Sequence, residues 1–167
     1  MPSSILTKGW FKNCSITYPS GRRLWLPPFP NGLTTAGINH MNDVTFRGAS
    51  QNASWYLGLI ANSGFTTVAA ADTSSSHSGW TEDQNYSEAT RVAWAPEASA
   101  SGLLVNAAAR EFTINAAATI KGIFISSSNT KGGTAGTLFS TGLFPSVNTL
   151  PIGAVLKIYY ELETREG

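Results

Sequence analysis

The sequence predicts an all-β fold: an antiparallel β-sandwich or jelly-roll-like domain with one short helix and an extended N-terminal arm. Nineteen Ser, eighteen Thr, sixteen Gly and eight Pro residues favour strands and tight turns over long helices, and only 13% of the 167 residues are charged. Six or seven short apolar runs recur at intervals of about 8–12 residues, which is the spacing of a sandwich or jelly roll. A chain of this length can bury enough surface for an ordinary hydrophobic core.

Residues 1–34 are expected to form the arm. They hold five of the eight prolines, and proline removes a strand hydrogen-bond donor and favours extended backbone. Large side chains accompany these prolines and need a surface on which to bury, namely Trp10, Phe11, Trp25, Leu26 and Phe29. We expect these residues, with Arg22 and Arg23, to contact a neighbouring subunit. An arm that packs on its own domain is the alternative.

Residues 35–167 are expected to form the sandwich domain, led by a helix over residues 35–47. Thr34 or Thr35 can cap this helix, because a threonine hydroxyl accepts from the free backbone N–H groups of the first turn. Its apolar residues form one rough stripe: Ile38, Met41, Val44 and Phe46.

Strands with short connections are expected from residue 54 onward. The run over 154–163 alternates most clearly, with Leu156, Ile158 and Tyr160 on one face and polar side chains on the other. The expected strands cover residues 54–61, 90–95, 103–106, 110–114, 119–126, 136–143 and 154–163, with loops at 70–85 and 126–136. The predicted core consists of Leu57, Leu59, Phe112, Ile114, Ile120, Phe124, Leu156 and Ile158.

No motif for catalysis, a cofactor or a metal occurs in the sequence. His40 and His77 are far apart, and zinc needs more ligands at closer spacing. Asp72, His77 and the serines around them have the residue types of a hydrolase triad, but a Ser-rich loop contains these types without the geometry. Paired carboxylates for glycoside hydrolysis have four candidates, Glu82, Asp83, Glu88 and Glu97. We expect no enzyme activity, no cofactor and no metal site.

Aromatic side chains are a better signal for binding. Five of them could line a sugar-binding face or fill the core: Trp55, Tyr56, Trp80, Tyr86 and Trp94. Trp55 and Trp94 lie in strand patterns and are expected in the core. Trp80 lies in a predicted loop and is the one we expect to contact a partner.

Net charge and hydropathy restrict the classes of partner and the cellular compartment that we expect for this chain. The net charge is +1 without a basic cluster, which argues against nucleic acid as the main partner. Cys14 is the sole cysteine, so no intrachain disulfide can form. Residues 2–9 lack the apolar run of a signal peptide and no stretch approaches 18 apolar residues, so we expect no membrane contact and synthesis in a cytosol.

A series of short motifs runs from Trp55 to Tyr160. In order they are YLGLI at 56–60, ADT at 71–73, SHSGWTE at 76–82, Tyr86, TR at 90–91, Trp94, FTINA at 112–116, SNTKGGT at 128–134, GTLFS at 136–140 and GAVLKIYY at 153–160. Their order and spacing resemble those of small β-rich virion structural proteins of tailed bacteriophages. The resemblance covers about two thirds of the chain. It implies a structural role without catalytic residues.

The resemblance implies synthesis in the host bacterial cytoplasm and a place in the virion, at one of two locations. The first is a capsid decoration or cement protein that binds the major capsid protein or other virion subunits and forms a dimer or trimer. The second is a tail-fibre, tail-tip or neck component with a glycan-binding face. A hydrolase on a β scaffold is the third and weakest hypothesis.

Overall fold

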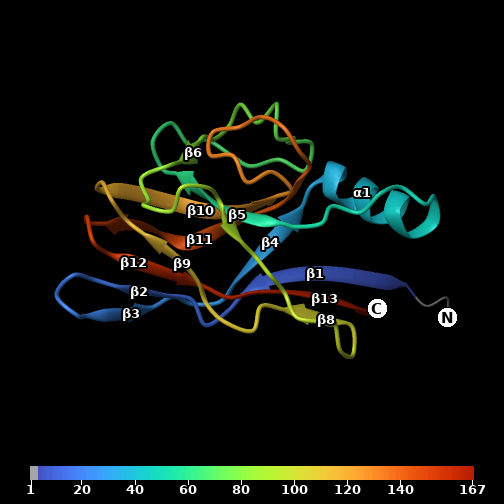
Figure 1. Cartoon of the computed structure of the whole chain (residues 1–167), viewed down its shortest axis with the longest axis horizontal. Helices are drawn as coiled ribbons and strands as arrows, with labels where there is room; N and C mark the ends of the chain where they lie inside the picture. The colour runs from blue at the N-terminus through green and yellow to red at the C-terminus, as the bar shows by residue number, and fades with distance from the viewer. Residues whose placement is uncertain (1–3) are drawn as a thin grey trace.

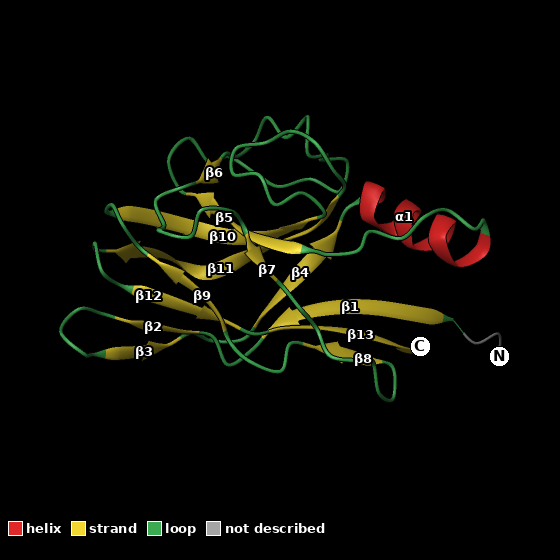
Figure 2. Ribbon diagram, viewed as in Figure 1, coloured by secondary structure: helices red, strands yellow, loops and turns green. Residues whose placement is uncertain are grey.

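Two antiparallel sheets pack as a sandwich in residues 4–167, the part of the chain that the structure, a computed structural model, describes (Figures 1 and 2). This arrangement confirms the predicted all-β class. The described elements are β1 Ile5–Phe11, β2 Ser15–Thr17, β3 Arg23–Trp25, β4 Phe29–Leu33, α1 Thr35–Phe46, β5 Tyr56–Ala61, β6 Glu82–Asp83, β7 Val92–Ala93, β8 Leu103–Val105, β9 Arg110–Thr113, β10 Ala118–Ser126, β11 Leu138–Leu150, β12 Val155–Ile158 and β13 Tyr160–Glu166.

The larger sheet has the order β6-β5-β10-β11-β4-β1-β13-β8, with β7 also paired to β5. The smaller sheet has the order β3-β2-β12-β9. The strand predicted over 154–163 is two strands, because the chain leaves β12 in the smaller sheet and enters β13 in the larger sheet around Tyr159. Its predicted alternation is nevertheless correct: Leu156, Ile158 and Tyr160 all point into the core.

The core lies between the two sheets. All eight residues predicted for the core are buried, with at most 2% of their surface exposed. Seven of them belong to this core, and Phe124 belongs to a second, smaller buried cluster with Ile60, Trp80 and Leu138. Aromatic rings fill the region where the sheets meet, and the ring of Phe11 lies 4.8 Å from those of both Phe29 and Tyr160. Two of these three rings come from the segment predicted to be an arm.

The prediction of an N-terminal arm is wrong for the described residues; residues 1–3 of the predicted arm lie outside them. Strand β1 pairs with β13 and β4, β4 also pairs with β11, and β2 and β3 belong to the smaller sheet. Pro30 lies within β4 opposite Trp10 of β1, and the pairing of β4 with β11 covers only Asn31–Leu33, so this proline needs no partner on β11. The division at residue 34 is therefore not a structural boundary.

Helix α1 confirms the predicted helix and its cap. The Thr34 hydroxyl accepts from the Gly37 N–H at 3.0 Å, and Gly37 packs against the backbone of Phe139. Gly37 is the buried residue of this helix. The predicted apolar stripe is covered only in part: Met41 packs against the core and Val44 is half-buried, whereas Ile38 and Phe46 are exposed.

The remaining loops and strands follow the prediction with shifted ends. The strand expected over 90–95 shrinks to the two residues of β7, and β11 extends seven residues beyond the expected end at 143, to Leu150. The expected loop over 70–85 contains the short strand β6. The Gly- and Ser-rich segment between β10 and β11 is a loop, as predicted.

Candidate docking surface

The structure separates the eight residues predicted to bind a partner. Phe11, Leu26 and Phe29 are buried in the chain's own core, and Trp10 is half-buried on β1. Trp80 is in a loop as predicted, but only 3% of its surface is exposed. Phe11, Leu26, Phe29 and Trp80 are corrections to the predicted interface, because their buried side chains serve the fold. The partner contact of Trp10 stays a prediction. Arg22, Arg23 and Trp25 remain, and they are exposed together.

The hairpin formed by β2 and β3 carries these three residues. Its turn is closed by two backbone hydrogen bonds of 2.8 Å, from the Tyr18 N–H to the Arg22 carbonyl and from the Gly21 N–H to the Tyr18 carbonyl. Gly21 has φ +81, a conformation that favours glycine. Strand β3 is the edge of the smaller sheet, and each of its three residues is exposed.

Each arginine of the hairpin lies over an aromatic ring. The Arg22 guanidinium carbon is 4.1 Å from the centre of the Tyr18 ring, and that of Arg23 is 5.7 Å from the centre of the Trp25 ring. Neither arginine is in an ion pair with a described residue. We call Tyr18, Arg22, Arg23 and Trp25 the hairpin surface. It offers two cations and a tryptophan that is 61% exposed.

Apolar side chains continue the hairpin surface. A shallow hollow of about 210 Å³ lies between Trp25 and the middle of β11, and its walls include Leu26 and Phe144. Leu24, Val147 and Ile152 are exposed around this end of the molecule. Figure 1 shows the β2–β3 hairpin and the β11–β12 connection at the same end of the long axis.

A second exposed apolar region lies at the opposite end. Ile38 and Phe46 on α1 and Ile5 at the start of β1 are exposed, Phe46 by 80%. Both elements reach the far end of the long axis from the hairpin (Figure 1). We call these three residues the helix surface. The described residues thus have exposed apolar side chains at both ends of the molecule.

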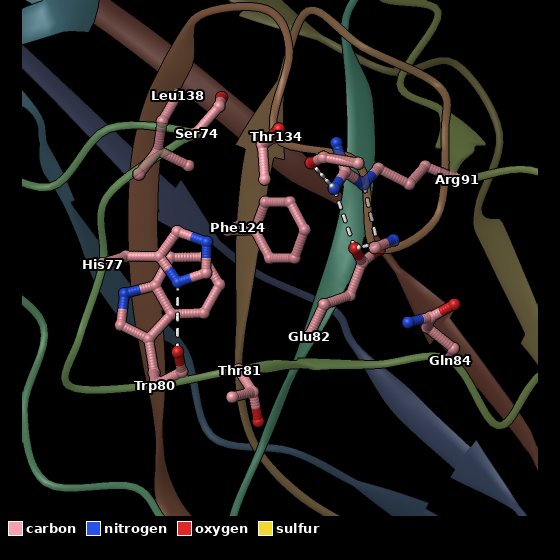
Figure 3. A pocket seen from close by; sticks show the side chains of 12 residues that line it. Ser74, His77, Trp80, Thr81, Glu82, Gln84, Arg91, Phe124, Thr134 and Leu138 are labelled. Carbon is pink, nitrogen blue, oxygen red and sulfur yellow. Dashed lines mark hydrogen bonds and ion pairs between the residues drawn. The ribbon is translucent and has the colours of Figure 1, made fainter.

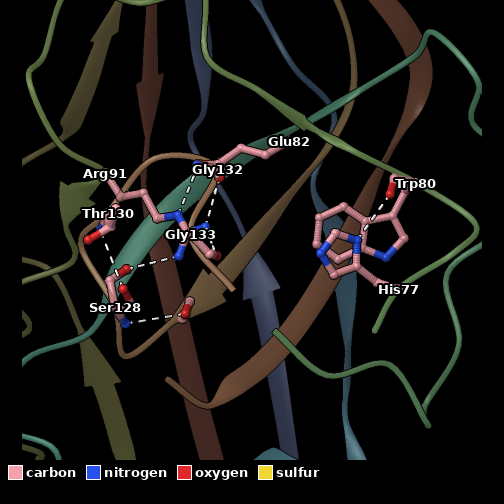
Figure 4. Close-up of polar contacts among 9 residues, drawn as sticks. His77, Trp80, Glu82, Arg91, Ser128, Thr130, Gly132 and Gly133 are labelled. Carbon is pink, nitrogen blue, oxygen red and sulfur yellow. Dashed lines mark hydrogen bonds and ion pairs between the residues drawn. The ribbon is translucent and has the colours of Figure 1, made fainter. Parts of the chain in front are cut away.

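The residues named for a hydrolase triad do not assemble one. The Asp72 carboxylate accepts from Trp80 Nε1 and from the Ala69 N–H, both at 2.9 Å. His77 Nδ1 lies 3.0 Å from the Trp80 carbonyl oxygen, and the His77 ring stacks on the indole with centres 4.0 Å apart (Figure 4). Asp72 and His77 both hold Trp80 in place, and neither is positioned by the other.

A buried ion pair between Arg91 and Glu82 was not predicted. Arg91 donates to both carboxylate oxygens of Glu82, at 2.9 and 2.7 Å, and their side chains are only 4% and 5% exposed. The guanidinium also donates to the carbonyls of Ser128 and Gly133, and Glu82 accepts from the Gly132 N–H (Figure 4). The pair therefore fastens the loop between β10 and β11. The sequence contains no spacing that would reveal it.

Two other carboxylates named for glycoside hydrolysis are also engaged. Asp83 accepts from the Asn85 N–H at 2.9 Å, and Glu88 accepts from the Thr113 N–H at 3.1 Å. Within residues 4–167, no group of three or more His, Cys, Asp or Glu side chains is placed to hold a metal ion. Among these residues there is also no helix long and apolar enough to cross a membrane.

Comparisons with known proteins identify no relative: no protein-family model matches the chain, and no curated protein matches its sequence.

Proposed function

We propose that this chain is a structural virion protein of a tailed bacteriophage, a capsid decoration or cement protein that docks on the head shell through its hairpin surface. The supporting observation is the pair of exposed arginines beside Trp25, which have no acidic partner among the described residues. Arg and Trp are the residue types that contribute most binding energy at protein interfaces. Their cations select a partner with exposed carboxylates, such as the major capsid protein or another virion subunit.

The two exposed ends support a bridging role. A protein that reinforces a shell must contact more than one neighbour, and the exposed apolar residues lie at both ends of the long axis. The helix surface is apolar and suits contact with another copy of the chain, in a dimer or trimer. The hairpin surface is cationic and aromatic and suits a different partner. Location in the tail or neck remains the second candidate, and the copy number in the particle distinguishes the two.

The test is incorporation into the particle. A phage that encodes Arg22→Glu and Arg23→Glu together should carry far fewer copies of this chain per virion, measured by quantitative mass spectrometry of purified particles. Lys121→Glu is the matched control, because Lys121 is also a cation without an ion pair among the described residues but lies on β10, outside the hairpin surface and the helix surface. In the unmodified phage, a copy number close to that of the capsid subunit is expected. Normal incorporation of the double variant would refute docking through the hairpin, and a few copies per particle would place the chain in the tail.

A further inference from the structure

A cavity of about 260 Å³ lies beside the buried ion pair, far from the hairpin in the sequence (Figure 3). The loop that leads into β6 provides one wall with Ser74, His77 and Trp80. Phe124 of β10 provides another wall, and the loop between β10 and β11 contributes Thr134. The volume is just below the range of about 300–1,000 Å³ that accommodates drug-sized ligands. The cavity can therefore admit one small ring, and it is too small for a chain of rings.

The charged groups of the cavity neutralise each other. Arg91 and Glu82 form its ion pair, and Arg91 donates four hydrogen bonds, two to Glu82 and two to backbone carbonyls. A charged ligand would therefore find no free opposite charge at Arg91 or Glu82, and separating these two buried ions to bind it would be costly. The cavity thus favours a neutral ligand.

Neutral polar groups remain on the cavity walls. Because the Trp80 carbonyl can only accept, Nδ1 of neutral His77 carries the hydrogen and Nε2 is an acceptor. In Figure 3 the end of the His77 ring points away from its own backbone, into the space that the other labelled residues surround. Gln84 and Thr134 are exposed side chains on the walls, and their amide and hydroxyl groups can both donate and accept.

A buried hydroxyl adds an independent indication. Ser74 lines the cavity, and only 7% of its surface is exposed. Its Oγ has no hydrogen-bond partner among the described residues. A buried hydroxyl without a partner is unfavourable, and such groups are rare in folded proteins. Two aromatic rings line the same cavity: those of Trp80 and Phe124, whose centres are 5.1 Å apart.

We propose that this cavity binds a neutral, hydroxyl-rich ring, a single sugar residue at the end of a glycan. Such a ring has hydroxyls that match the His77, Gln84, Thr134 and Ser74 groups, and an apolar face that matches the half-buried His77 ring. Phe124 only closes the wall behind it, because 2% of its surface is exposed and the Arg91 guanidinium carbon lies 4.9 Å from its ring centre. An aliphatic ligand would leave the polar groups unpaired. Trp80, which was expected to contact a partner, is buried here and supports the His77 ring from behind.

The test is an NMR titration of the full chain, labelled with ¹⁵N, with the methyl glycosides of glucose, galactose, N-acetylglucosamine and rhamnose. At least one sugar should shift the amide signals of residues 74–84 and 132–134, with a dissociation constant of about 1 mM for a single ring. His77→Phe retains the stacked ring but removes the acceptor, and Gln84→Ala removes an exposed amide. Each change should weaken binding by about tenfold.

Matched controls separate recognition from damage to the fold. His40→Phe and Gln51→Ala change the same residue types beside α1, at a different hollow, and should leave sugar binding unchanged. The proposal is overturned if no sugar shifts these signals, if His77→Phe and Gln84→Ala bind as tightly as the unmodified chain, or if inorganic phosphate binds more tightly than every sugar. The site does not depend on docking through the hairpin, so either proposal can fail without the other.

Discussion

Replacing Arg91 with Met should destabilise the protein strongly. The substitution removes the cation of a pair whose two side chains are 4% and 5% exposed. Glu82 would keep one hydrogen bond, from the Gly132 N–H at 2.6 Å, and would lose both bonds from the guanidinium. The carbonyls of Ser128 and Gly133 would lose their donor as well. A carboxylate would then be buried without a counter-charge.

The expected loss in the free energy of unfolding is about 3–5 kcal/mol, the usual cost of breaking a buried pair by removing one partner. For a domain of this size, one kcal/mol lowers the midpoint of thermal unfolding by about 2–4 °C. The midpoint should therefore fall by about 6–20 °C. Replacing both Arg91 and Glu82 by apolar residues should cost clearly less than the sum of the single changes, because neither charge is then left alone.

Urea unfolding at 25 °C, monitored by tryptophan fluorescence, measures these losses. Lys157→Met is the matched control, since the Lys157–Glu111 pair is much more exposed and its loss should cost less than about 1 kcal/mol. Hydrogen exchange should also show faster exchange in residues 127–137 of the Arg91 variant. A loss below about 1 kcal/mol for Arg91→Met, equal to that of the control, would refute the structural role assigned to the pair.

Three further changes test the fold. Deleting residues 1–34 removes β1 and β4 from within the larger sheet, so circular dichroism should show an unfolded chain; a folded product would restore the arm hypothesis. Gly58→Ala would place a methyl group on the Phe124 ring and should cost about 1–3 kcal/mol in urea unfolding, whereas Gly64→Ala would meet no neighbouring atom, although its positive φ adds strain. Burial raises the pKa of the Cys14 thiol from 9.0 to about 11. The contribution of the protonated thiol to the free energy of unfolding should therefore be complete below pH 9 and be lost as the pH rises to 11. If the unfolding midpoint of Cys14→Ala falls as steeply over this pH range as that of the unmodified chain, this prediction is contradicted.

The sequence was sufficient to predict the fold class and the core because these depend on local patterns. Alternation and apolar runs identified Leu57, Phe112 and Leu156 as core residues, and a threonine before an apolar stripe identified the start of α1. The assignment of residues 1–34 failed for a non-local reason. Proline density indicated a segment that avoids sheets, but Phe11 and Phe29 find partners more than a hundred residues away, on β13 and β11.

The candidate sites were only partly predictable. Arg22, Arg23 and Trp25 lie within four consecutive residues, and a hairpin keeps such neighbours together, so their joint exposure follows from local structure. Contacts between distant segments carry no such signal. Strand β5 pairs with both β6 and β10, and this pairing brings Glu82 to the loop at 128–133, where Arg91 contacts both. No spacing in the sequence indicates this contact.

The way the two sheets are joined bears directly on a bridging role. A protein that links two neighbours resists both compression and tension only if its two contact surfaces keep a fixed separation. The hairpin surface belongs to the smaller sheet, whereas β1 belongs to the larger sheet and α1 packs on β11 of that sheet. The chain passes from one sheet to the other between β12 and β13, and there Ile158 and Tyr160 keep both strands anchored in one core. The ends are thus connected through close-packed side chains, which resist deformation far better than a flexible arm would.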